Sequence, residues 1–543
     1  MSDARSSFDA ATLEVLWTRL ISTVDEAAAA LVRSSFSTLV RESHDFSCVL
    51  TDPNGYSTVQ ATRSIPSFIG TLPRTVRHFL AEFPPDDIHP GDVFVTNDMY
   101  QGTGHLPDIS VAKPIFHNDR LVGFAASVAH APDIGGKIRS PEPREVFEEG
   151  FQIPIMKLAE RGVVNPTLIA LLRKNVRVPD QVVGDLWAQL SALDLMENRV
   201  VQLLEAYDLD SLDGLAEEIQ RRSETAMRTA IGALPDGVYR SSLDTDGLEM
   251  PVHLEAAVFI EGDRLRVDFT GSSDQVGRAI NVATCYTFAY TAYGLKCAVS
   301  PDIPNNEGTL RPITIEAPEG SILNPVYPAA GGSRVLVGHY LPILMFQALS
   351  DVVPENVMAG AGSPLWGMNH SGVKDGRPYA NMFFFNGGTG ASAHGDGHNT
   401  LSWPSNVSST SIEVSERIAP VRFVHKRLRP GSGGDGRHRG GLGQELLVEN
   451  LSDSPVAVSF LAERTRFAAP GVAGGKPGRC GKVTLNWEEV DPKRQYVLKR
   501  GDVVGLATPG GGGYGPPRER SPSARERDID FGYVEEAGDE ARA

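Results

Sequence analysis

Residues 105–136 read HLPDISVAKPIFHNDRLVGFAASVAHAPDIGG, and this stretch sets the geometry expected around it. The apolar runs at 109–112 and 124–128 have the composition of two strands, and residues 117–119 between them have that of a tight turn. In an antiparallel hairpin, residues far apart in sequence return to the same end of the strand pair. We therefore expect the two ends of this stretch to lie side by side.

Each end of the stretch carries a His-x-x-Asp unit, His105 with Asp108 and His130 with Asp133. Neutral imidazole and carboxylate are the ligands that zinc, manganese and iron prefer. Gly and Pro surround both units, which predicts loops rather than one helical face. A single unit of this kind is more often a pair of turn residues that cap a strand. Two units flanking one hairpin favour a divalent-metal or catalytic site.

Length and composition limit the class of protein. The 543 residues exceed what one hydrophobic core supports, so we expect three or four domains. The high content of Gly and Pro favours a turn-rich chain that contains β-structure. The net charge of −17 argues against nucleic acid or an anionic membrane as a partner. Four scattered cysteines, no secretory signal and no apolar run of membrane-spanning length predict a soluble, cytoplasmic protein with reduced thiols.

Helical and alternating patterns fall in separate blocks, which predicts an α+β fold with several domains, a multidomain mixed α/β chain. Apolar residues at helical spacing predict helices at 8–34, 67–82, 164–230 and 282–299. From about residue 236 the pattern changes to the alternation of strands, and this change is the best candidate for a boundary. We expect an N-terminal α+β domain at 1–235 with the hairpin-borne metal site, and a central α+β domain at 236–400.

The last third of the chain alternates short strands with glycine clusters and shows no repeat period. We expect a Gly-rich, mostly β C-terminal region at 401–515 and a mobile tail at 516–543, which is charged and poor in aliphatic residues. Residues 510–513 are all glycine and offer N–H groups that could cradle an anion, although a glycine run is more often a flexible turn. No Walker-type phosphate loop occurs, which argues against a self-contained nucleotide site.

Four further side chains are candidates near these motifs. Asp98 shortly precedes His105 and is either a further ligand or orienting group, or the acceptor of an Asx-turn. Asp45 and Ser47 lie where a strand begins, and they either bind substrate or simply form hydrogen bonds with backbone groups. Arg334 lies in a Gly-rich loop and could clamp an anion, although a surface arginine is the more common case.

Taken together, these stretches resemble the hydantoinase B/oxoprolinase family. The resemblance keeps the same order from about residue 8 to 518, and these segments carry it: Asp45-Phe46-Ser47, 91–98, His105 to Asp108, His130, Asp133 to Gly136, Glu149-Gly150, 175–177, 184–185, 268–272, Asn281, 308–313, Asn324-Pro325, 439–443 and 508–513. The chain departs from the family pattern at Met99, where proline is usual, at Gly104 before the first histidine, and at Ser43-His44, where Arg-Glu is usual. These changes border the predicted site and bear on the substrate rather than on the fold.

The resemblance implies a subunit of an ATP-dependent amidohydrolase that opens hydantoin, 5-oxoproline or another lactam. It implies that His105, Asp108 and His130 hold a divalent metal ion (zinc, manganese or iron), as in related ketone carboxylases. It also implies a hydantoinase A-type partner that binds ATP with Mg and activates the amide oxygen by phosphorylation. The other expected roles are general base for Asp133 or Asp98, and substrate contact for Asp45, Ser47 and Arg334.

Two other functions fit the same residues. The first is an ATP-dependent ketone carboxylase of the acetone or acetophenone type, which uses the same fold. The greater length of acetone carboxylase subunits favours the hydrolase. The second is a non-catalytic scaffold for the A-type subunit, and retention of the full His/Asp set argues against it.

Overall fold

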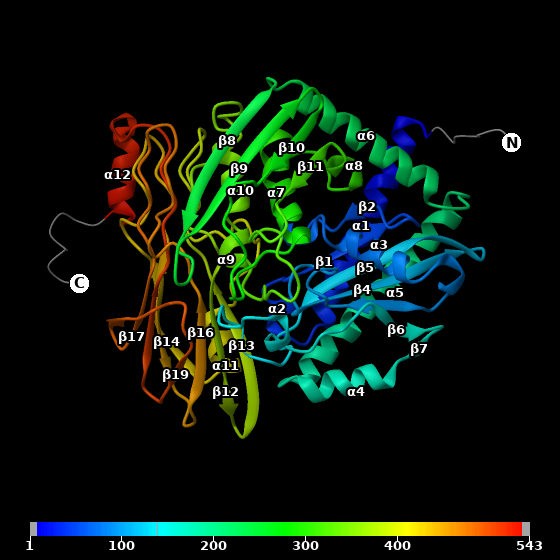
Figure 1. The fold of residues 1–543 in the computed structure, drawn as a ribbon, viewed down its shortest axis with the longest axis horizontal. Coiled ribbons are helices and arrows are strands. Elements are labelled where there is room, and N and C mark those ends of the chain that lie inside the picture. The colour runs from blue at the N-terminus through cyan, green and yellow to red at the C-terminus, as the bar shows by residue number, and fades with distance from the viewer. Residues whose placement is uncertain (1–7, 138, 535–543) are drawn as a thin grey trace.

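The computed structural model describes residues 8–137 and 139–534, which form an α+β arrangement of four sheets with helices (Figure 1). The N-terminal part contains an antiparallel seven-stranded sheet in the order β2-β1-β5-β4-β3-β6-β7. Its strands are β1 (Phe46–Thr51), β2 (Ser57–Gln60), β3 (Val93–Thr96), β4 (Asp108–His117), β5 (Arg120–His130), β6 (Met156–Glu160) and β7 (Val163–Val164). Strands β1 and β5 are buried at nearly every position, as expected for a sheet covered on both faces.

The hairpin of β4 and β5 confirms the sequence prediction. Asn118 and Asp119 join the strands with φ values of 49° and 60°, the left-handed conformation that a two-residue type I′ turn requires at both positions. The register of the hairpin places Asp108 directly opposite His130 at its open end. The two predicted motifs therefore lie side by side.

The helices before residue 235 are α1 (Ala10–Ser34), α2 (Thr38–Arg41), α3 (Leu72–Glu82), α4 (Pro166–Asn175), α5 (Pro179–Ala206) and α6 (Asp213–Gly232). Helix α1 begins after Asp9, whose side chain accepts hydrogen bonds from the N–H groups of Ala11 and Thr12. The apolar stripe of α1 packs against α5, and α5 contacts β4 and β5. The helices predicted at 8–34, 67–82 and 164–230 are confirmed, the second after a 3-10 turn at Pro66–Phe68.

The middle of the chain contains a four-stranded sheet in the order β11-β10-β9-β8. Its strands are β8 (Gly237–Thr245), β9 (Val252–Glu261), β10 (Arg264–Asp268) and β11 (Ile313–Glu316), and its helices are α7 (Thr284–Val299), α8 (Glu307–Leu310), α9 (Val335–Gly338) and α10 (Leu341–Ala348). Exposure alternates along β8, which confirms the change of pattern predicted near residue 236. The helix predicted at 282–299 is α7.

The C-terminal part contains two sheets with a second apolar core, formed by side chains such as Trp366, Phe383 and Leu446. One sheet has the order β13-β12-β16-β19: β12 (Trp366–Lys374), β13 (Arg377–Phe385), β16 (Val456–Leu461) and β19 (Tyr496–Leu498). The other has the order β14-β15-β20-β17-β18: β14 (Val421–Leu428), β15 (Gln444–Asn450), β17 (Lys482–Leu485), β18 (Glu488–Glu489) and β20 (Val503–Ala507). Helix α11 (Ile412–Ile418) precedes β14. The predicted divisions near residues 235 and 400 stay predictions.

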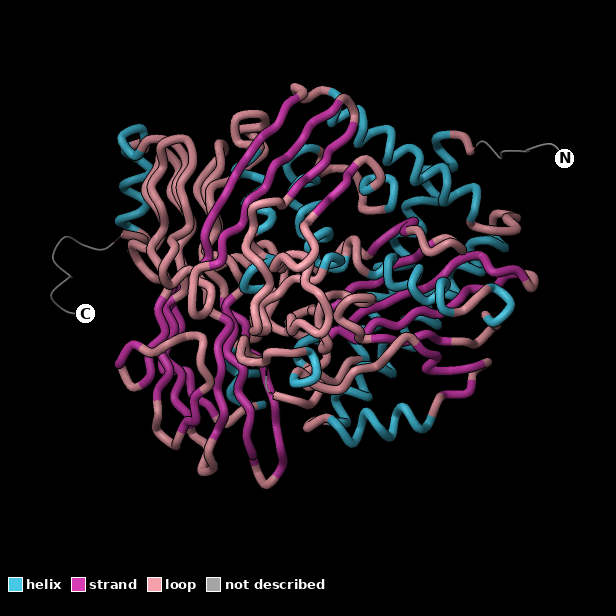
Figure 2. Tube along the Cα trace, in the orientation of Figure 1, coloured by secondary structure: helices cyan, strands magenta, loops and turns pink. Residues whose placement is uncertain are grey.

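The glycine clusters are neither flexible turns nor an anion cradle. They form extended segments that lie side by side and appear as loops beside α12 (Pro522–Asp530) in Figure 2. The N–H groups of Gly511 and Gly512 donate to the carbonyls of Gly441 and Gly360, so they are not free to bind an anion. A Cβ added to Gly388 would lie 1.8 Å from the carbonyl oxygen of Gly441. Glycine is therefore required here by close backbone packing.

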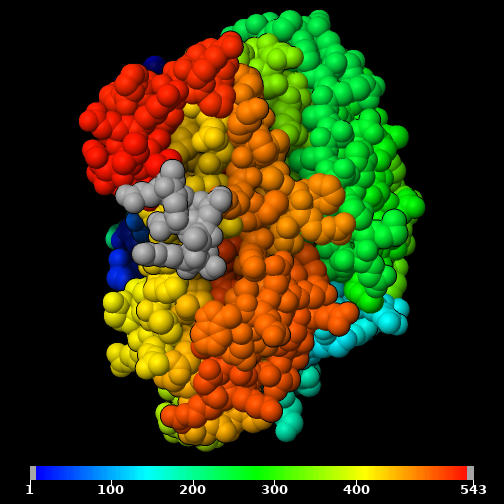
Figure 3. Space-filling view, turned by 90° about the vertical axis from the view of Figure 1, so that its left-hand side faces the viewer, coloured from blue at the N-terminus to red at the C-terminus, as the bar shows by residue number. Residues whose placement is uncertain are grey.

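Residues 516–534 differ from the expected tail because they form a 3-10 turn at Pro517–Glu519 and helix α12. Arg520 pairs with Asp396, and Asp528 pairs with the buried Arg439, which ties α12 to the glycine-rich segments. In Figure 3 this helix, in red, lies at one corner of the face, beside the yellow and orange segments of the C-terminal part of the chain. Residues 535–543 lie outside the described residues. Within the described ranges, no helix is long and apolar enough to cross a membrane.

Candidate functional site

Three side chains meet at the open end of the β4–β5 hairpin. Asp108 begins β4 and His130 ends β5, while His105 lies in the loop between β3 and β4. Oδ1 of Asp108 lies 2.8 Å from Nε2 of His105 and 2.9 Å from Nδ1 of His130. All three residues are at most 3% exposed. One ligand atom from each can be chosen so that all three lie within 4.8 Å of one another, so the group could hold a metal ion.

The environment of His105 fits a metal ligand. Its Nδ1 lies 3.3 Å from the carbonyl oxygen of Gly332, which favours the tautomer with the proton on Nδ1. Nε2 then carries the lone pair. This buried atom has no aligned hydrogen bond within residues 8–137 and 139–534, although Asp108 is close. Two imidazoles and a carboxylate with one unsatisfied nitrogen suit zinc, manganese or iron.

Electrostatics keep this group in the protonation states that bind a cation. Burial, and then the charge of Arg334, hold the pKa of His105 well below its ordinary value, so the imidazole is neutral at pH 7. Burial alone would raise the pKa of Asp108. The charge of Arg334 and a hydrogen bond from His130 outweigh burial and hold that pKa well below its ordinary value. The donor set is therefore preformed before any ion binds.

Asp45 belongs to the same cluster, whereas Ser47 does not. Asp45 Oδ2 lies 3.9 Å from Nδ1 of His130, and burial, with the neighbouring charge of Asp108, raises the pKa of Asp45. Ser47 is buried two residues further along, and its hydroxyl accepts a hydrogen bond from Ser64 at 2.6 Å. Of the two, only Asp45 lines the cavity of about 350 Å³ that contains the histidines.

Arg334 is buried in the site, which corrects the more common expectation of a surface arginine. It is 2% exposed, and its Nη2 donates to Oδ2 of Asp108 at 2.9 Å. Its guanidinium lies over the ring of Tyr286, 4.1 Å from the ring centroid. A Cβ added to Gly104, where φ is +100°, would lie 3.0 Å from Nε of Arg334. Gly104, which departs from the family pattern, therefore makes room for this arginine.

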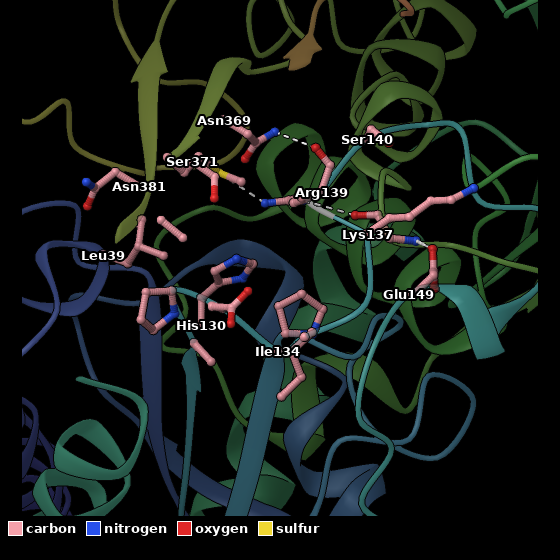
Figure 4. Close-up of a pocket in the computed structure, with 18 of the residues that line it drawn as sticks. Leu39, His130, Ile134, Lys137, Arg139, Ser140, Glu149, Asn369, Ser371 and Asn381 are labelled. Atoms are coloured by element: carbon pink, nitrogen blue, oxygen red, sulfur yellow. Dashed lines mark hydrogen bonds between the residues drawn. The ribbon is translucent and has the colours of Figure 1, made fainter. Parts of the chain in front are cut away.

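A groove of about 680 Å³ adjoins the inner cavity, and His130 and Arg139 line both (Figure 4). The loop after β5 forms one side of the groove, and residues of β12 and β13 form the other. Arg139 Nε donates to the carbonyl of Gly332 at 3.0 Å, and Asn369 donates to the carbonyl of Arg139 at 2.6 Å. Burial, and then the charge of Arg334, lower the pKa of Arg139 to about 10.

Glu149 also lines the groove and is 7% exposed. Its carboxylate accepts hydrogen bonds from the N–H groups of Gly332 at 2.5 Å and Gly331 at 3.4 Å. Burial raises its pKa to about 7 despite these bonds. A carboxyl group with this pKa can both take and give a proton near neutral pH.

The two candidate bases differ in position. Asp133 lines the groove beside His130, but both of its oxygens accept hydrogen bonds from Arg177. Asp98 caps a turn instead, where Oδ1 accepts hydrogen bonds from the N–H groups of Tyr100 and Gln101, as its interpretation as an Asx-turn predicts. Neither placement supports a free general base, and their catalytic roles stay predictions.

Sequence reasoning gives no role to three residues of the site, Arg139, Glu149 and Tyr286. In the sequence, Glu149 appears only in the Glu149-Gly150 segment, which contributes to the family resemblance and indicates no role for the carboxylate. Tyr286 lies on α7, and Arg139 lies in a loop without a motif. Their roles come from contacts between distant segments, and no local pattern encodes those contacts.

Comparison with known proteins agrees with the family resemblance found in the sequence. A family model described as hydantoinase B/oxoprolinase matches residues 9–517. A putative subunit of a D-/L-hydantoinase from Pseudomonas sp. (strain NS671) is 31% identical, and the match covers 97% of this chain and 93% of that protein.

Two solved structures have the same fold. The ATP-dependent caprolactamase from Pseudomonas jessenii has a TM-score of 0.89 at 27% identity, and the match covers 98% of this chain and 96% of that chain. A nucleotide-free acetone carboxylase has a TM-score of 0.86 at 20% identity, over 96% of this chain and 78% of that chain. The second likeness shows the fold alone.

Proposed function

Because this chain belongs to the hydantoinase B/oxoprolinase family, we propose that it is a subunit of an ATP-dependent amidohydrolase that opens a hydantoin, 5-oxoproline or another lactam. The observation that carries the proposal is the buried group of His105, Asp108 and His130 next to a groove that His130 also lines. The similar proteins are described as a hydantoinase subunit and a caprolactamase, which favours cyclic amides as the substrate class.

Amide resonance makes a lactam carbonyl a poor electrophile, so its hydrolysis needs activation. A divalent ion held by His105, Asp108 and His130 would supply Lewis acidity, which polarises a carbonyl and acidifies water. In our proposal Arg334 and Asp45 position the substrate in the inner cavity. Glu149 gives a proton to the departing ring nitrogen, because its pKa near 7 allows that transfer at neutral pH.

We further propose a separate A-type subunit that binds ATP with Mg and phosphorylates the amide oxygen. The sequence contains no Walker-type phosphate loop, and the hydantoinase relative is itself described as one subunit of its enzyme. The groove beside His130 is the place where the activated amide would meet the residues of this chain.

The test is reconstitution with the A-type subunit and ATP against a panel of hydantoin, 5-oxoproline and caprolactam. We expect ADP and the ring-opened product to form in equal amounts, with at least a thousandfold loss in His105→Ala. His253→Ala is the matched control, because this histidine is partly exposed on β9 and pairs with Asp244. Full activity of the His105→Ala complex would revive the scaffold function. Consumption of bicarbonate with a ketone would replace the hydrolase by a carboxylase.

A further inference from the structure

Arg334 has more hydrogen-bond donors than the protein satisfies. Nη2 donates to Asp108, but Nε and Nη1 have no partner within residues 8–137 and 139–534. The residue is 2% exposed and lines the inner cavity. A buried charged group with unpaired donors is costly, and an anion in the cavity would relieve that cost.

The guanidinium is also held in place before any ligand arrives. The Tyr286 ring lies under it, Asp108 fixes one edge, and the absence of a side chain at Gly104 leaves the space it occupies. Arginine in a fixed, partly unsatisfied orientation is the usual donor for bidentate recognition of phosphate or carboxylate.

A second arginine adds to the positive charge of the cavity. Arg139 lines it as well and uses its Nε on the Gly332 carbonyl. Two guanidinium groups face two carboxylates there, Asp45 and Asp108. A divalent cation on the histidines would leave an excess of about two positive charges in a buried space. A neutral lactam cannot compensate that charge, whereas a phosphoryl group can.

We propose that the inner cavity is an oxyanion site in which Arg334 and Arg139 bind a phosphoryl group. This inference rests on the proposed function for its source: the group belongs to the phosphorylated amide or is the phosphate released from it. The binding site itself belongs to this chain and does not require turnover.

The test is calorimetric titration of the full chain, first with a divalent metal ion bound and again after treatment with chelator, with inorganic phosphate, acetate and neutral 2-pyrrolidone. We expect phosphate to bind at least tenfold more tightly than acetate, and 2-pyrrolidone not to compete. Arg334→Gln should weaken phosphate binding at least tenfold, and Arg334→Lys less. The control is Arg439→Gln, another buried arginine, which pairs with Asp528 beside α12. Arg139→Lys tests the second arginine if Arg334→Gln does not fold.

Assays of the reconstituted enzyme distinguish the two sources of the phosphoryl group, the phosphorylated amide and the phosphate released from it. Free phosphate should inhibit turnover, and Arg334→Lys should raise the inhibition constant. If the Arg334 variant changes only the rate at saturating ATP and lactam, the site serves the activated amide alone, which also supports the proposal. Phosphate affinity unchanged by every Arg334 and Arg139 variant, or preference for acetate, would overturn it. An inactive complex whose chain still binds phosphate through Arg334 would instead refute the proposed function alone.

Discussion

Replacing Glu149 by glutamine should remove a pH-dependent loss of stability. The free energy of unfolding of the variant, minus that of the native chain, should therefore increase as pH rises. The native carboxyl is 7% exposed, and burial raises its pKa from an ordinary 4.5 to about 7. Below pH 4.5 the group is protonated in both the folded and the unfolded chain. Between 4.5 and 7 the unfolded chain loses this proton and the folded chain keeps it, so the free energy of unfolding falls. Above pH 7 the loss is constant.

The size of the effect follows from the difference between the two pKa values. Each pH unit in that window is worth about 1.4 kcal/mol, which gives about 3 kcal/mol for the whole window. For a chain of 543 residues, an unfolding entropy of about 2 cal/mol/K per residue converts this into about 3 °C in Tm. The interval from pH 5 to pH 7.5 covers most of this window, so the difference in Tm, variant minus native, should rise by about 2 °C across it.

The assay is thermal unfolding of both proteins at half-unit pH intervals from 5 to 8. Other groups that titrate in this range, such as the buried Glu463 with its raised pKa of about 7, are shared by both proteins and cancel in the difference. Glu148→Gln is the matched control. Its carboxylate is exposed, and a hydrogen bond from Lys137 lowers its pKa, so its Tm difference should be flat over this range. A flat or falling difference for Glu149→Gln would refute the assignment of a buried, partly neutral carboxyl.

Three further outcomes follow from the contacts described. His105→Ala should lose nearly all metal detected by mass spectrometry in chain purified without chelator, and retained metal would contradict the ligand assignment. Gly388→Ala should lower Tm by several degrees or abolish soluble expression, because its Cβ would overlap the Gly441 carbonyl. Gly395→Ala has open space and should be neutral, so equal behaviour would contradict the packing argument. Asp528→Ala leaves the charge of buried Arg439 unpaired and should cost about 3 kcal/mol, read as a fall in Tm.

The metal group can be predicted because its geometry is local. Strand composition and a two-residue turn set the register that places Asp108 against His130, and His105 is only three residues from Asp108. The Gly-rich loop around Arg334 marks it as a candidate, but nothing in that loop indicates its burial. A separation of 226 residues from Asp108 leaves no local signal of the contact between them. Glu149 and Arg139 escape prediction for the same reason.

The glycine clusters show a different reason for failure. In sequence, a run of glycines is typical of a turn, and this interpretation uses only backbone freedom. In the structure, the same residues are required because another backbone lies where a Cβ would be, as between Gly511 and the Thr389 carbonyl. The neighbour that makes glycine necessary lies far away in the chain, so the residue type is visible in the sequence and its cause is not.

The C-terminal sheets take part in the site as well as in the fold. The carbonyl of Arg139 accepts hydrogen bonds from Asn369 on β12 at 2.6 Å and from Ser459 on β16 at 2.7 Å. These two bonds fix the backbone of the loop that begins at His130, and the Arg139 side chain then reaches back to the Gly332 carbonyl. His105 orients its ring against that same carbonyl. The orientation of one candidate ligand therefore depends on strands more than 250 residues away, because one carbonyl is shared between the loop and the imidazole.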